Sequence, residues 1–417
     1  MVLTKLVFAS LALILAKYLA ELWLDRLNAA SVRANAAAVP GAYAGIIGED
    51  EYFKSVRYTL DKIRFAGFEG AYGALVLALV LLFGVFPALF GAFVSLFGSS
   101  VFAQALALVL TLAAVSLPSL PPEWYSQFVI EQRYGFNKST FGLWISDKAK
   151  EFAISLVIGI PLLSLILWLF GVFERTWWIW AFCAMAIFQI LMLVLYPRLI
   201  LPLFNKLSPL EDGDLRDRLL SAADRAGFRA NSIFVIDGSR RSSHSNAFFT
   251  GFGKFRRIVL YDTLISQLST SELEAVLAHE IGHYKLGHVP KMIAGSFAMM
   301  FFGFAAIAWL ARSPWFYEGF GFPPDSGMAP ALLLFSVLVP LFTFWLTPLF
   351  NRLSRRYEYQ ADAFAKAVCG GSGDLVASLR KLHAKNLGNL TPHRIYSAFH
   401  YSHPTLLERE AALNQKD

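Results

Sequence analysis

Residues 177–201 read WWIWAFCAMAIFQILMLVLYPRLIL, and this stretch decides the fold. It contains 25 residues, of which only Arg198 is charged. About 20 apolar residues suffice for a helix to cross the roughly 30 Å of hydrocarbon in a bilayer. Because a soluble domain has little use for an apolar segment of this length, Trp177–Leu201 predicts a membrane-spanning helix.

Similar apolar runs recur along the chain and determine its composition. Hydrophobic residues make up 56% of the 417 residues and charged residues only 16%, whereas soluble domains hold about 45–50% and about 25% respectively. An ordinary soluble enzyme and a disordered scaffold are therefore both excluded. We expect seven membrane-spanning helices, over Leu3–Leu24, Phe68–Phe97, Val101–Leu120, Phe152–Val172, Trp177–Leu201, Met292–Leu310 and Ala329–Phe350.

The first run differs from the others because Lys17 and Glu21 interrupt it. Its Leu6–Ala16 core resembles the apolar region of a secretory signal peptide. No small-residue cleavage site followed by a secretory, cysteine-bearing domain is evident, so we expect this helix to be retained.

Basic residues are distributed unevenly between the connections of these runs. Of the 37 Lys and Arg, 33 fall in the loops Asp25–Gly67 and Pro121–Glu151 and in the polar regions Arg198–Lys291 and Asn351–Asp417. All four segments lie on one side of a seven-span arrangement, and the positive-inside rule places that side in the cytosol. The net charge of +7 therefore reflects membrane topology, and no nucleic-acid partner is expected.

The first long polar region is expected to form a small α+β unit. Residues Gly213–Ala226 carry Leu and Ala at helical spacing, with Asp and Arg on the other face. Short β-branched and aromatic runs then predict strands over Ser232–Ile236, Ala247–Thr250 and Ile258–Tyr261.

We divide the chain into four parts on this basis. They are residues 1–200, with membrane helices one to five and two cytosolic loops; residues 201–291, the α+β part of a catalytic unit; residues 292–350, with membrane helices six and seven; and residues 351–417, the C-terminal part of the catalytic unit.

The helix after the strands contains His279-Glu280-Ile281-Gly282-His283. Two histidines four residues apart on a helix project from one face, so both imidazoles can reach one metal ion, with Glu280 beside them. The spacing of Ser271 and Glu274 predicts a capping box at the start of this helix, and Gly287 and Pro290 predict its end.

A catalytic zinc site requires a third protein ligand and leaves one position for water. The two cysteines, Cys183 and Cys369, cannot form a cysteine-type site. In the segment 351–365, Glu358 and Asp362 share a helical face, so Glu358 can bind the metal while Asp362 accepts the free ring N–H of a ligand histidine. The alternative is a surface helix with solvated charges; the neighbouring His-Glu-x-x-His helix favours the metal site.

Several further segments resemble one protein family. They are Tyr134-Gly-Phe-Asn137, Ser245-Asn246-Ala-Phe-Phe-Thr-Gly251, Arg257-Ile-Val-Leu-Tyr-Asp262-Thr and Tyr401-Ser-His403-Pro-Thr-Leu-Leu-Glu-Arg409, together with the metal helix and residues 351–365. Over most of its length the chain is similar to the CAAX prenyl protease 1 family of membrane zinc endopeptidases. It departs from the family pattern at Thr405, where a second proline is usual, and in the short linker Ile265–Ser271, where some eukaryotic relatives carry a long charged insertion.

This resemblance implies a fold and an activity. The fold is an all-α dominated integral membrane protein, in which seven transmembrane helices enclose a chamber and a small α+β zinc-metalloprotease unit lies on the cytosolic side. The activity is cleavage of prenylated CAAX-type proteins near their C-terminus, with release of the last three residues. One Zn²⁺ per chain would activate a water molecule, with the lipid bilayer and the peptide or protein substrate as partners.

The resemblance and the motif also imply roles for individual residues. Glu280 is the expected general base, and His403 the expected donor to the developing oxyanion. Asn246 and Arg409 are expected to contact the substrate, which would add to the strand at Asn246 as an extended edge. The other histidines are expected to be surface or packing residues, namely His244, His288, His383, His393 and His400.

Two other functions compete with this interpretation. A quality-control peptidase would keep the chemistry and cut unprenylated or misfolded membrane proteins. A seven-helix transporter or receptor would place ionisable residues within several spans, whereas most spans here carry none. The host membrane is expected to be the bacterial inner membrane or the endoplasmic reticulum.

Overall fold

The computed structural model describes residues 4–228, 232–250 and 257–415. Within these ranges seven helical segments are long and apolar enough to cross a membrane, which confirms the predicted number. Leu3, the predicted start of the first span, lies outside the described residues. The segments are Lys5–Ala34, Glu49–Leu82, Val101–Tyr134, Phe141–Val172, Trp177–Phe204, His288–Leu310 and Met328–Cys369.

Several of these segments consist of helices in series, and a proline lies at some of the junctions, such as Pro161 or Pro197. Proline lacks the amide donor, so the backbone changes its hydrogen bonding there. The helices are α1 (Lys5–Ala34), α2 (Glu49–Leu82), α4 (Val101–Ser116), α5 (Leu120–Tyr125), α6 (Gln132–Tyr134), α7 (Phe141–Ile154), α8 (Ile160–Val172), α9 (Trp177–Leu195), α10 (Leu201–Phe204), α14 (His288–Leu310), α16 (Met328–Thr343) and α17 (Thr347–Cys369), with α15 (Pro314–Glu318) in a connection.

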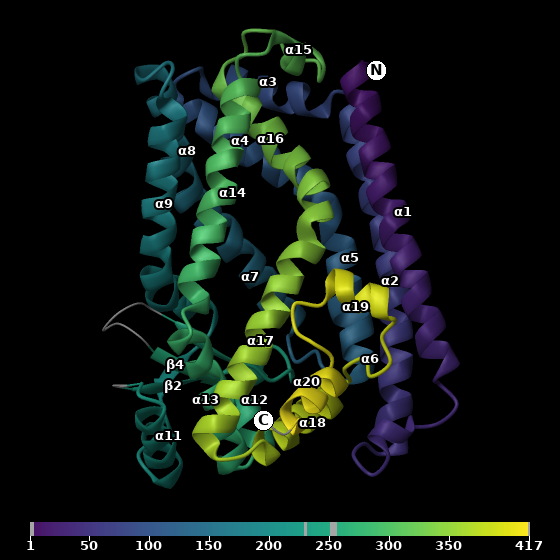
Figure 1. Cartoon of the computed structure of the whole chain (residues 1–417). Coiled ribbons are helices and arrows are strands. Elements are labelled where there is room, and N and C mark those ends of the chain that lie inside the picture. Colours follow the sequence, from purple (N-terminus) through teal and green to yellow (C-terminus); the bar gives the residue numbers. More distant parts are fainter. Residues whose placement is uncertain (1–3, 229–231, 251–256, 416–417) are drawn as a thin grey trace.

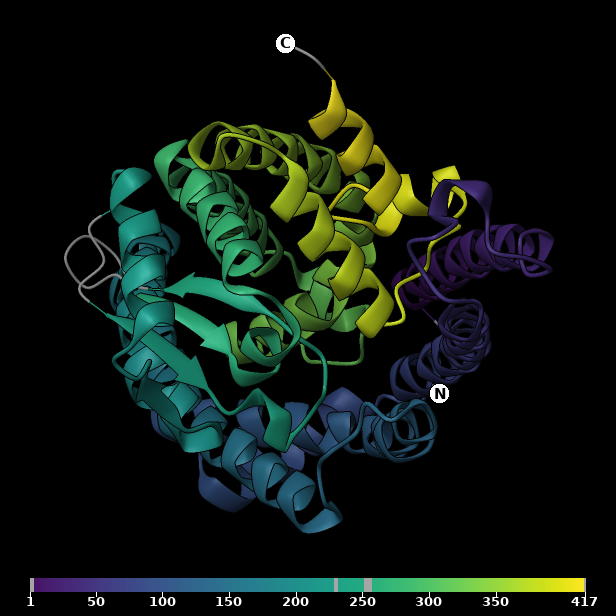
Figure 2. The same ribbon diagram turned by 90° about the horizontal axis from the view of Figure 1, so that it is seen from below.

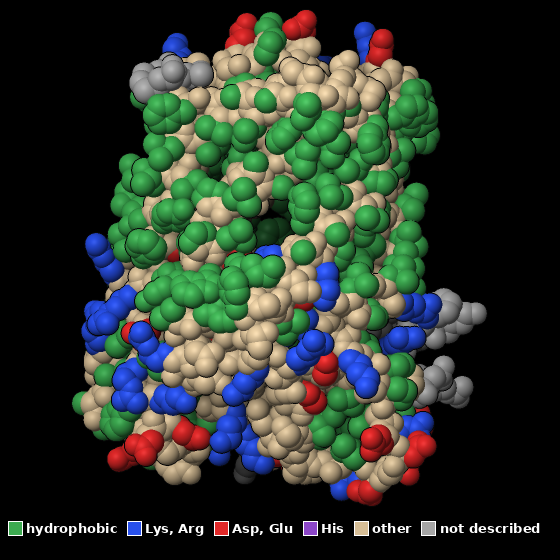
Figure 3. Space-filling view, turned by 180° about the vertical axis from the view of Figure 1, so that it is seen from behind, with side chains coloured by type: hydrophobic (Ala, Val, Ile, Leu, Met, Phe, Trp, Pro, Cys, Tyr) green, Lys and Arg blue, Asp and Glu red, His purple; other side chains and the backbone are tan. Residues whose placement is uncertain are grey.

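The outer surface is apolar over most of its height. Val157 is 73% exposed and Phe302 is 66% exposed, which suits contact with lipid chains rather than water. Figure 3 shows one face, on which hydrophobic side chains cover the upper part, a hollow opens in the middle, and Lys and Arg gather in the lower part. Seen from below, the helices stand around the rim of the molecule (Figure 2).

The prediction of one span over Phe68–Phe97 is wrong. Gly84 adopts a left-handed conformation, with φ of 62°, and separates α2 from a second helix, α3 (Val85–Phe97). With 13 residues α3 is too short to cross a bilayer. The second span is therefore α2, which begins 19 residues before the predicted start, and α3 lies at the end of the molecule opposite the sheet (Figure 1).

The polar region after the fifth span forms a four-stranded sheet with the order β1-β2-β4-β3. Strands β1 (Leu207–Pro209) and β2 (Ile233–Ile236) are antiparallel, β2 and β4 (Arg257–Tyr261) are parallel, and β3 (Ala247–Thr250) runs antiparallel to β4 at the edge. Three of these strands match the predictions. Strand β1 was not predicted, because three residues that end in proline give no alternating pattern.

Helix α11 (Asp214–Arg225), α12 (Asp262–Gln267) and α13 (Thr270–Lys285) accompany the sheet. Leu219 of α11, Ile258 of β4 and Ile281 of α13 belong to one buried apolar cluster. Burial of these side chains holds α13, with its His-Glu-x-x-His sequence, against the sheet and α11.

The predicted capping box of α13 is displaced by two residues. The Ser269 hydroxyl accepts from the Glu272 amide, and the Glu272 carboxylate accepts from the Ser269 amide at 2.7 Å. Glu274 instead forms ion pairs with Arg218 and Arg225 of α11, at 2.8 and 2.9 Å. The helix ends at Lys285, and Pro290 lies in the first turn of α14, where its missing amide is tolerated.

The last membrane segment continues into the polar unit, where α17 crosses α13. The crossing is close because residue 282 is glycine: a Cβ there would lie 3.1 Å from the Ala361 Cα and 3.2 Å from the Phe364 Cβ. The predicted division at residue 350 falls within α17, so one helix joins the membrane part to the catalytic part. Helices α18 (Gly373–Lys385), α19 (Arg394–His400) and α20 (Leu406–Asn414) complete the unit.

We expect Gly282→Ala to lower the free energy of unfolding by about 1–3 kcal/mol, because the added methyl group must push α13 away from the α17 backbone. The matched control is Gly295→Ala in α14, where a Cβ would meet nothing within 4 Å. Thermal unfolding in detergent, followed by tryptophan fluorescence, measures the difference. Equal melting temperatures for the two variants would contradict the close crossing.

Candidate active site

Helices α13 and α17 bring three side chains to one point. The Nε2 atoms of His279 and His283 lie 3.3 Å apart. The Glu358 carboxylate places Oε1 3.2 Å from His283 Nε2 and Oε2 3.5 Å from His279 Nε2. Ligands about 2.1 Å from a tetrahedral zinc ion are about 3.4 Å from one another. The three side chains therefore have the spacing of a zinc site.

The polar atoms at this point suit a cation. Glu358 is 4% exposed, and its buried Oε2 has no hydrogen-bond partner within the described part of the chain. A buried carboxylate oxygen without a partner carries a large desolvation cost, which a bound metal ion removes. His279, His283 and Glu358 are also the usual ligand types for catalytic zinc, so the residues present fit the metal.

A carboxylate orients the first histidine. Asp362 Oδ1 lies 2.8 Å from His279 Nδ1, as the spacing of Glu358 and Asp362 led us to expect. The ring therefore donates from Nδ1 and keeps the Nε2 lone pair for the metal. Burial alone would lower the pKa of His279, but its hydrogen bond to Asp362 and the Glu358 carboxylate 3.5 Å from its Nε2 raise it to about 9. A metal ion bound at Nε2 would take the place of a proton there.

A second histidine orients the other ligand. His288, fully buried, places Nδ1 3.0 Å from His283 Nδ1, and its Nε2 lies 2.9 Å from Gln360 Oε1. Since Gln360 Oε1 can only accept, His288 Nδ1 is free to accept from His283, which leaves the His283 Nε2 lone pair for the metal. His288 also stacks on Tyr357 at 4.2 Å.

His288 was expected to be a surface or packing residue, and its contact with His283 was not predicted. The bend at Gly287 turns His288 back toward His283. The sequence alone does not indicate the direction of this bend.

Arg409 holds the carboxylate that orients His279. Its Nε and Nη2 contact the two oxygens of Asp362 at 2.8 and 2.5 Å, and Nη1 lies 3.8 Å from Glu358 Oε2. Arg409 is carried by α20, whose first turn is capped by Thr405 and Glu408. The threonine that departs from the family pattern thus has a local structural role.

The remaining predicted residues line one cavity of about 530 Å³, which His279 and Glu358 also border. Glu280, His403 and Asn246 all border it, as does Arg409. His403 is 64% exposed at its side chain and places Nε2 3.4 Å from Glu358 Oε1. Burial raises the pKa of Glu280, which favours proton uptake by this carboxylate. The structure therefore collects residues from four separate sequence segments.

Asn246 is held in place by a loop that docks on the membrane segments. Arg241 contacts the Asp147 carboxylate of α7 at 2.9 and 3.1 Å, and Ser242 pairs with Asn137. The His244 ring stacks on Phe136 at 4.0 Å. Asn246 follows this loop, and its carbonyl oxygen accepts from the Tyr261 amide of β4. The segment 134–137 therefore positions the edge strand at the cavity.

Comparisons with known proteins agree with this geometry. Residues 28–206 match the model of the CAAX prenyl protease N-terminal region with five membrane helices, and residues 209–417 match peptidase family M48. CAAX prenyl protease 1 of Saccharomyces cerevisiae is 39% identical over 88% of this chain and 86% of its own length. The CAAX prenyl protease 1 homolog of Arabidopsis thaliana is 36% identical over 96% of this chain and 95% of its own length.

A solved structure has the same fold. The crystal structure of S. mikatae Ste24p superposes with a TM-score of 0.91 at 34% identity, covering 99% of this chain and all of that one.

We expect His288→Leu to weaken zinc binding by about 10–100-fold, because His283 would lose the partner that fixes its ring. The control is His393→Ala, since His393 caps the short helix α19 and does not contact the ligands. Competition against a fluorescent zinc chelator measures the affinity. Zinc affinity equal to that of the unmodified protein in His288→Leu would mean that His288 only fills space.

Proposed function

Because this chain belongs to the CAAX prenyl protease 1 family of membrane-embedded zinc metalloendopeptidases, we propose that it hydrolyses prenylated CAAX-type proteins near their C-terminus. The observation that carries the proposal is the spacing of His279, His283 and Glu358, with Glu280 in the adjoining cavity. These three residues would hold one zinc ion per chain. When bound, zinc would supply a Lewis acid and lower the pKa of a water molecule in the site.

Glu280 is the proposed general base. It follows the ligand His279 on α13 and borders the cavity in which a peptide bond would lie. Its raised pKa brings it nearer to neutral pH, where a carboxylate can both take a proton from water and return it to the leaving amine.

His403 is the proposed donor to the oxygen on which negative charge develops. Its exposed Nε2 points to the same region as Glu358, and Ser402 Oγ lies 2.9 Å from its Nδ1. If the hydroxyl of Ser402 donates to Nδ1, the ring keeps its proton on Nε2 and can donate there.

The substrate backbone is proposed to pair with strand β3. This strand lies at the edge of the sheet and begins beside Asn246, which borders the cavity. An extended peptide can add to such an edge through main-chain hydrogen bonds. Arg409 borders the same cavity, and its Nη1, which lies 3.8 Å from Glu358 Oε2, is proposed to contact the substrate.

The membrane orientation follows from charge. The positive-inside rule supports a catalytic unit on the cytosolic side, of either an endoplasmic reticulum membrane or a bacterial inner membrane. In this arrangement residues 201–291 and 351–417 form the catalytic unit, and residues 1–200 and 292–350 the membrane part.

We expect Glu280→Gln to lower kcat/KM for a CAAX peptide by about 10²–10⁴-fold while zinc content stays unchanged, because the base is lost and the ligands remain. Glu274→Gln on the same helix is the matched control, since Glu274 forms surface ion pairs with α11. Peptide cleavage by mass spectrometry and zinc by elemental analysis give both readouts. Full activity in Glu280→Gln would exclude the proposed base.

We expect a farnesylated CAAX peptide to be cut with at least about tenfold higher kcat/KM than its unprenylated twin. Burial of only two methylene groups of the prenyl chain accounts for a factor of this size. The expected product lacks the last three residues. Equal cutting of both peptides would contradict prenyl selection and favour a quality-control peptidase with the same chemistry.

A further inference from the structure

One stripe along α2 changes from basic to aromatic. Lys54, Arg57, Asp61 and Arg64 recur at spacings of three and four, which places them on one face of the helix. Three aromatic residues, Phe65, Phe68 and Tyr72, continue the same face. From Lys54 to Tyr72 the stripe is about 27 Å long, and the change falls where the polar first half of α2 gives way to its apolar second half.

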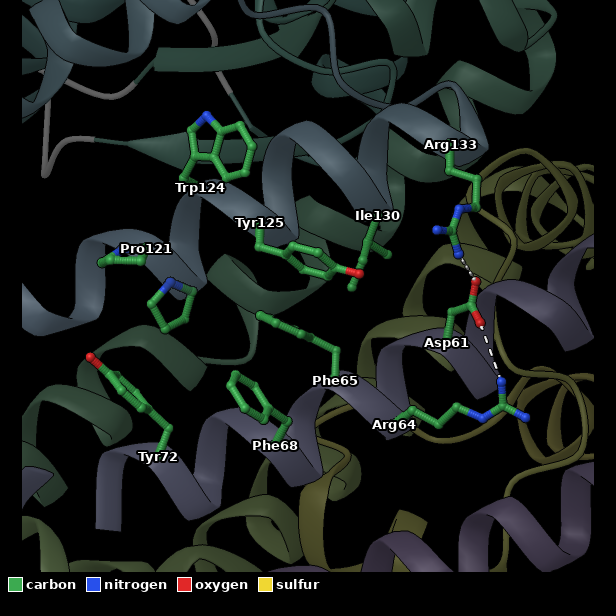
Figure 4. A pocket seen from close by; sticks show the side chains of 11 residues that line it. Asp61, Arg64, Phe65, Phe68, Tyr72, Pro121, Trp124, Tyr125, Ile130 and Arg133 are labelled. Carbon is green, nitrogen blue, oxygen red and sulfur yellow. Dashed lines mark hydrogen bonds and ion pairs between the residues drawn. The ribbon is translucent and has the colours of Figure 1, made fainter. Parts of the chain in front are cut away.

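The segment from α5 to α6 forms the opposite wall and changes at the same level. Pro121, Trp124 and Tyr125 face the aromatic part of the stripe, and Phe65 stacks on Tyr125 at 5.1 Å. Arg133 faces the basic part, where Asp61 pairs with it at 2.7 Å and with Arg64 at 4.0 Å. Figure 4 shows the aromatic side chains on both walls and the Arg133–Asp61–Arg64 chain at one end.

The two walls enclose a groove in two connected parts. The aromatic part has a volume of about 690 Å³, and the basic part, which shares Asp61, Arg64 and Arg133 with it, about 540 Å³. The basic part is bordered by Lys54 and Arg57 as well. Four cationic side chains therefore surround one carboxylate, which leaves three positive charges over for an anion.

The groove is separate from the polar cavity near the active site. Lys62 and Glu69, seven residues apart on α2, border a different cavity that also contains Arg241 and His244. They lie about 100° around the helix from Asp61 and Phe68. Phe68 is 61% exposed and Trp124 is 41% exposed, as expected of aromatic side chains at a membrane interface.

We propose that this groove binds one anionic phospholipid of the surrounding bilayer. An acyl chain lies between the aromatic walls, and the phosphate lies among Arg57, Arg64 and Arg133. The charge surplus selects an anion, and the adjoining apolar volume distinguishes a lipid from free phosphate. The bound lipid thus bridges α2 and the α5–α6 segment at the level where both leave the hydrocarbon.

Native mass spectrometry of the purified full-length protein in detergent tests the proposal. The probes are dioleoyl phosphatidylglycerol and dioleoyl phosphatidylcholine, which share their acyl chains and differ in net charge. We expect the protein to retain phosphatidylglycerol in preference to phosphatidylcholine. We expect Arg57→Gln/Arg64→Gln to bind phosphatidylglycerol about 30-fold more weakly, because the loss of two charges corresponds to about 2 kcal/mol. The matched control is Arg26→Gln/Arg33→Gln, which removes two exposed charges from α1. Thermal unfolding verifies that each variant is folded.

The apolar part has its own control pair. Phe68→Ala should weaken phosphatidylglycerol binding by about tenfold, whereas Phe302→Ala, which removes an equally exposed aromatic ring from α14, should not. Equal retention of phosphatidylglycerol and phosphatidylcholine would overturn the proposal. So would an equal loss of phosphatidylglycerol binding in Arg57→Gln/Arg64→Gln and in Arg26→Gln/Arg33→Gln. Phosphatidylglycerol binding that is weakened in Arg57→Gln/Arg64→Gln and unchanged in Phe68→Ala would show an anion site without a lipid site, which also overturns it.

Discussion

The close crossing of α13 and α17 is the contact on which the site depends. His279 and His283 come from one helix and Glu358 comes from the other, so the geometry of the proposed metal site is set by the distance between the two helix axes. Gly282 allows the α17 backbone to approach within van der Waals contact at Ala361. The other faces of α13 are also fixed, since Ile281 packs with the sheet cluster and Ala278 with a cluster that includes α18 residues. A helix buried on several sides cannot slide or rotate to relax the crossing.

The sequence was sufficient for the parts of the molecule that rest on composition and short spacing. Long apolar runs predict spans because no other environment accommodates them, and a spacing of four places His279 and His283, or Glu358 and Asp362, on one face. The sequence was insufficient where a single backbone angle determines where a helix ends. Gly84 breaks one apolar run into α2 and α3, and hydropathy does not register this break. Two Ser-x-x-Glu patterns overlap at residues 269–274. Only the structure shows which one caps the helix, because Ser269 and Glu272 form the reciprocal hydrogen bonds while Glu274 pairs with α11.

The buried partners of the ligands illustrate the same limit. Asp362 was predictable because it lies one turn from Glu358 on the same helix. His288 was not, because its contact with His283 requires the reversal at Gly287 and an acceptor, Gln360, from a helix 72 residues away. Tertiary contacts of this kind have no local signature, although they decide which nitrogen of each ring carries the proton.

Charge balance explains why these groups are buried together. With the histidines neutral, as metal ligands are, the ionised carboxylates of Glu358 and Asp362 carry two negative charges, and Arg409 offsets one of them. One negative charge remains in a region where Glu358 and Asp362 are 4% and 1% exposed, while burial raises the pKa of Glu280 and favours its protonated form. A divalent cation compensates this charge. The salt bridge of Arg409 with Asp362 keeps that carboxylate ionised, and it thereby acts through His279 on the metal site. Since uncompensated buried charge is costly, metal binding and the stability of the α13–α17 crossing are coupled in this fold.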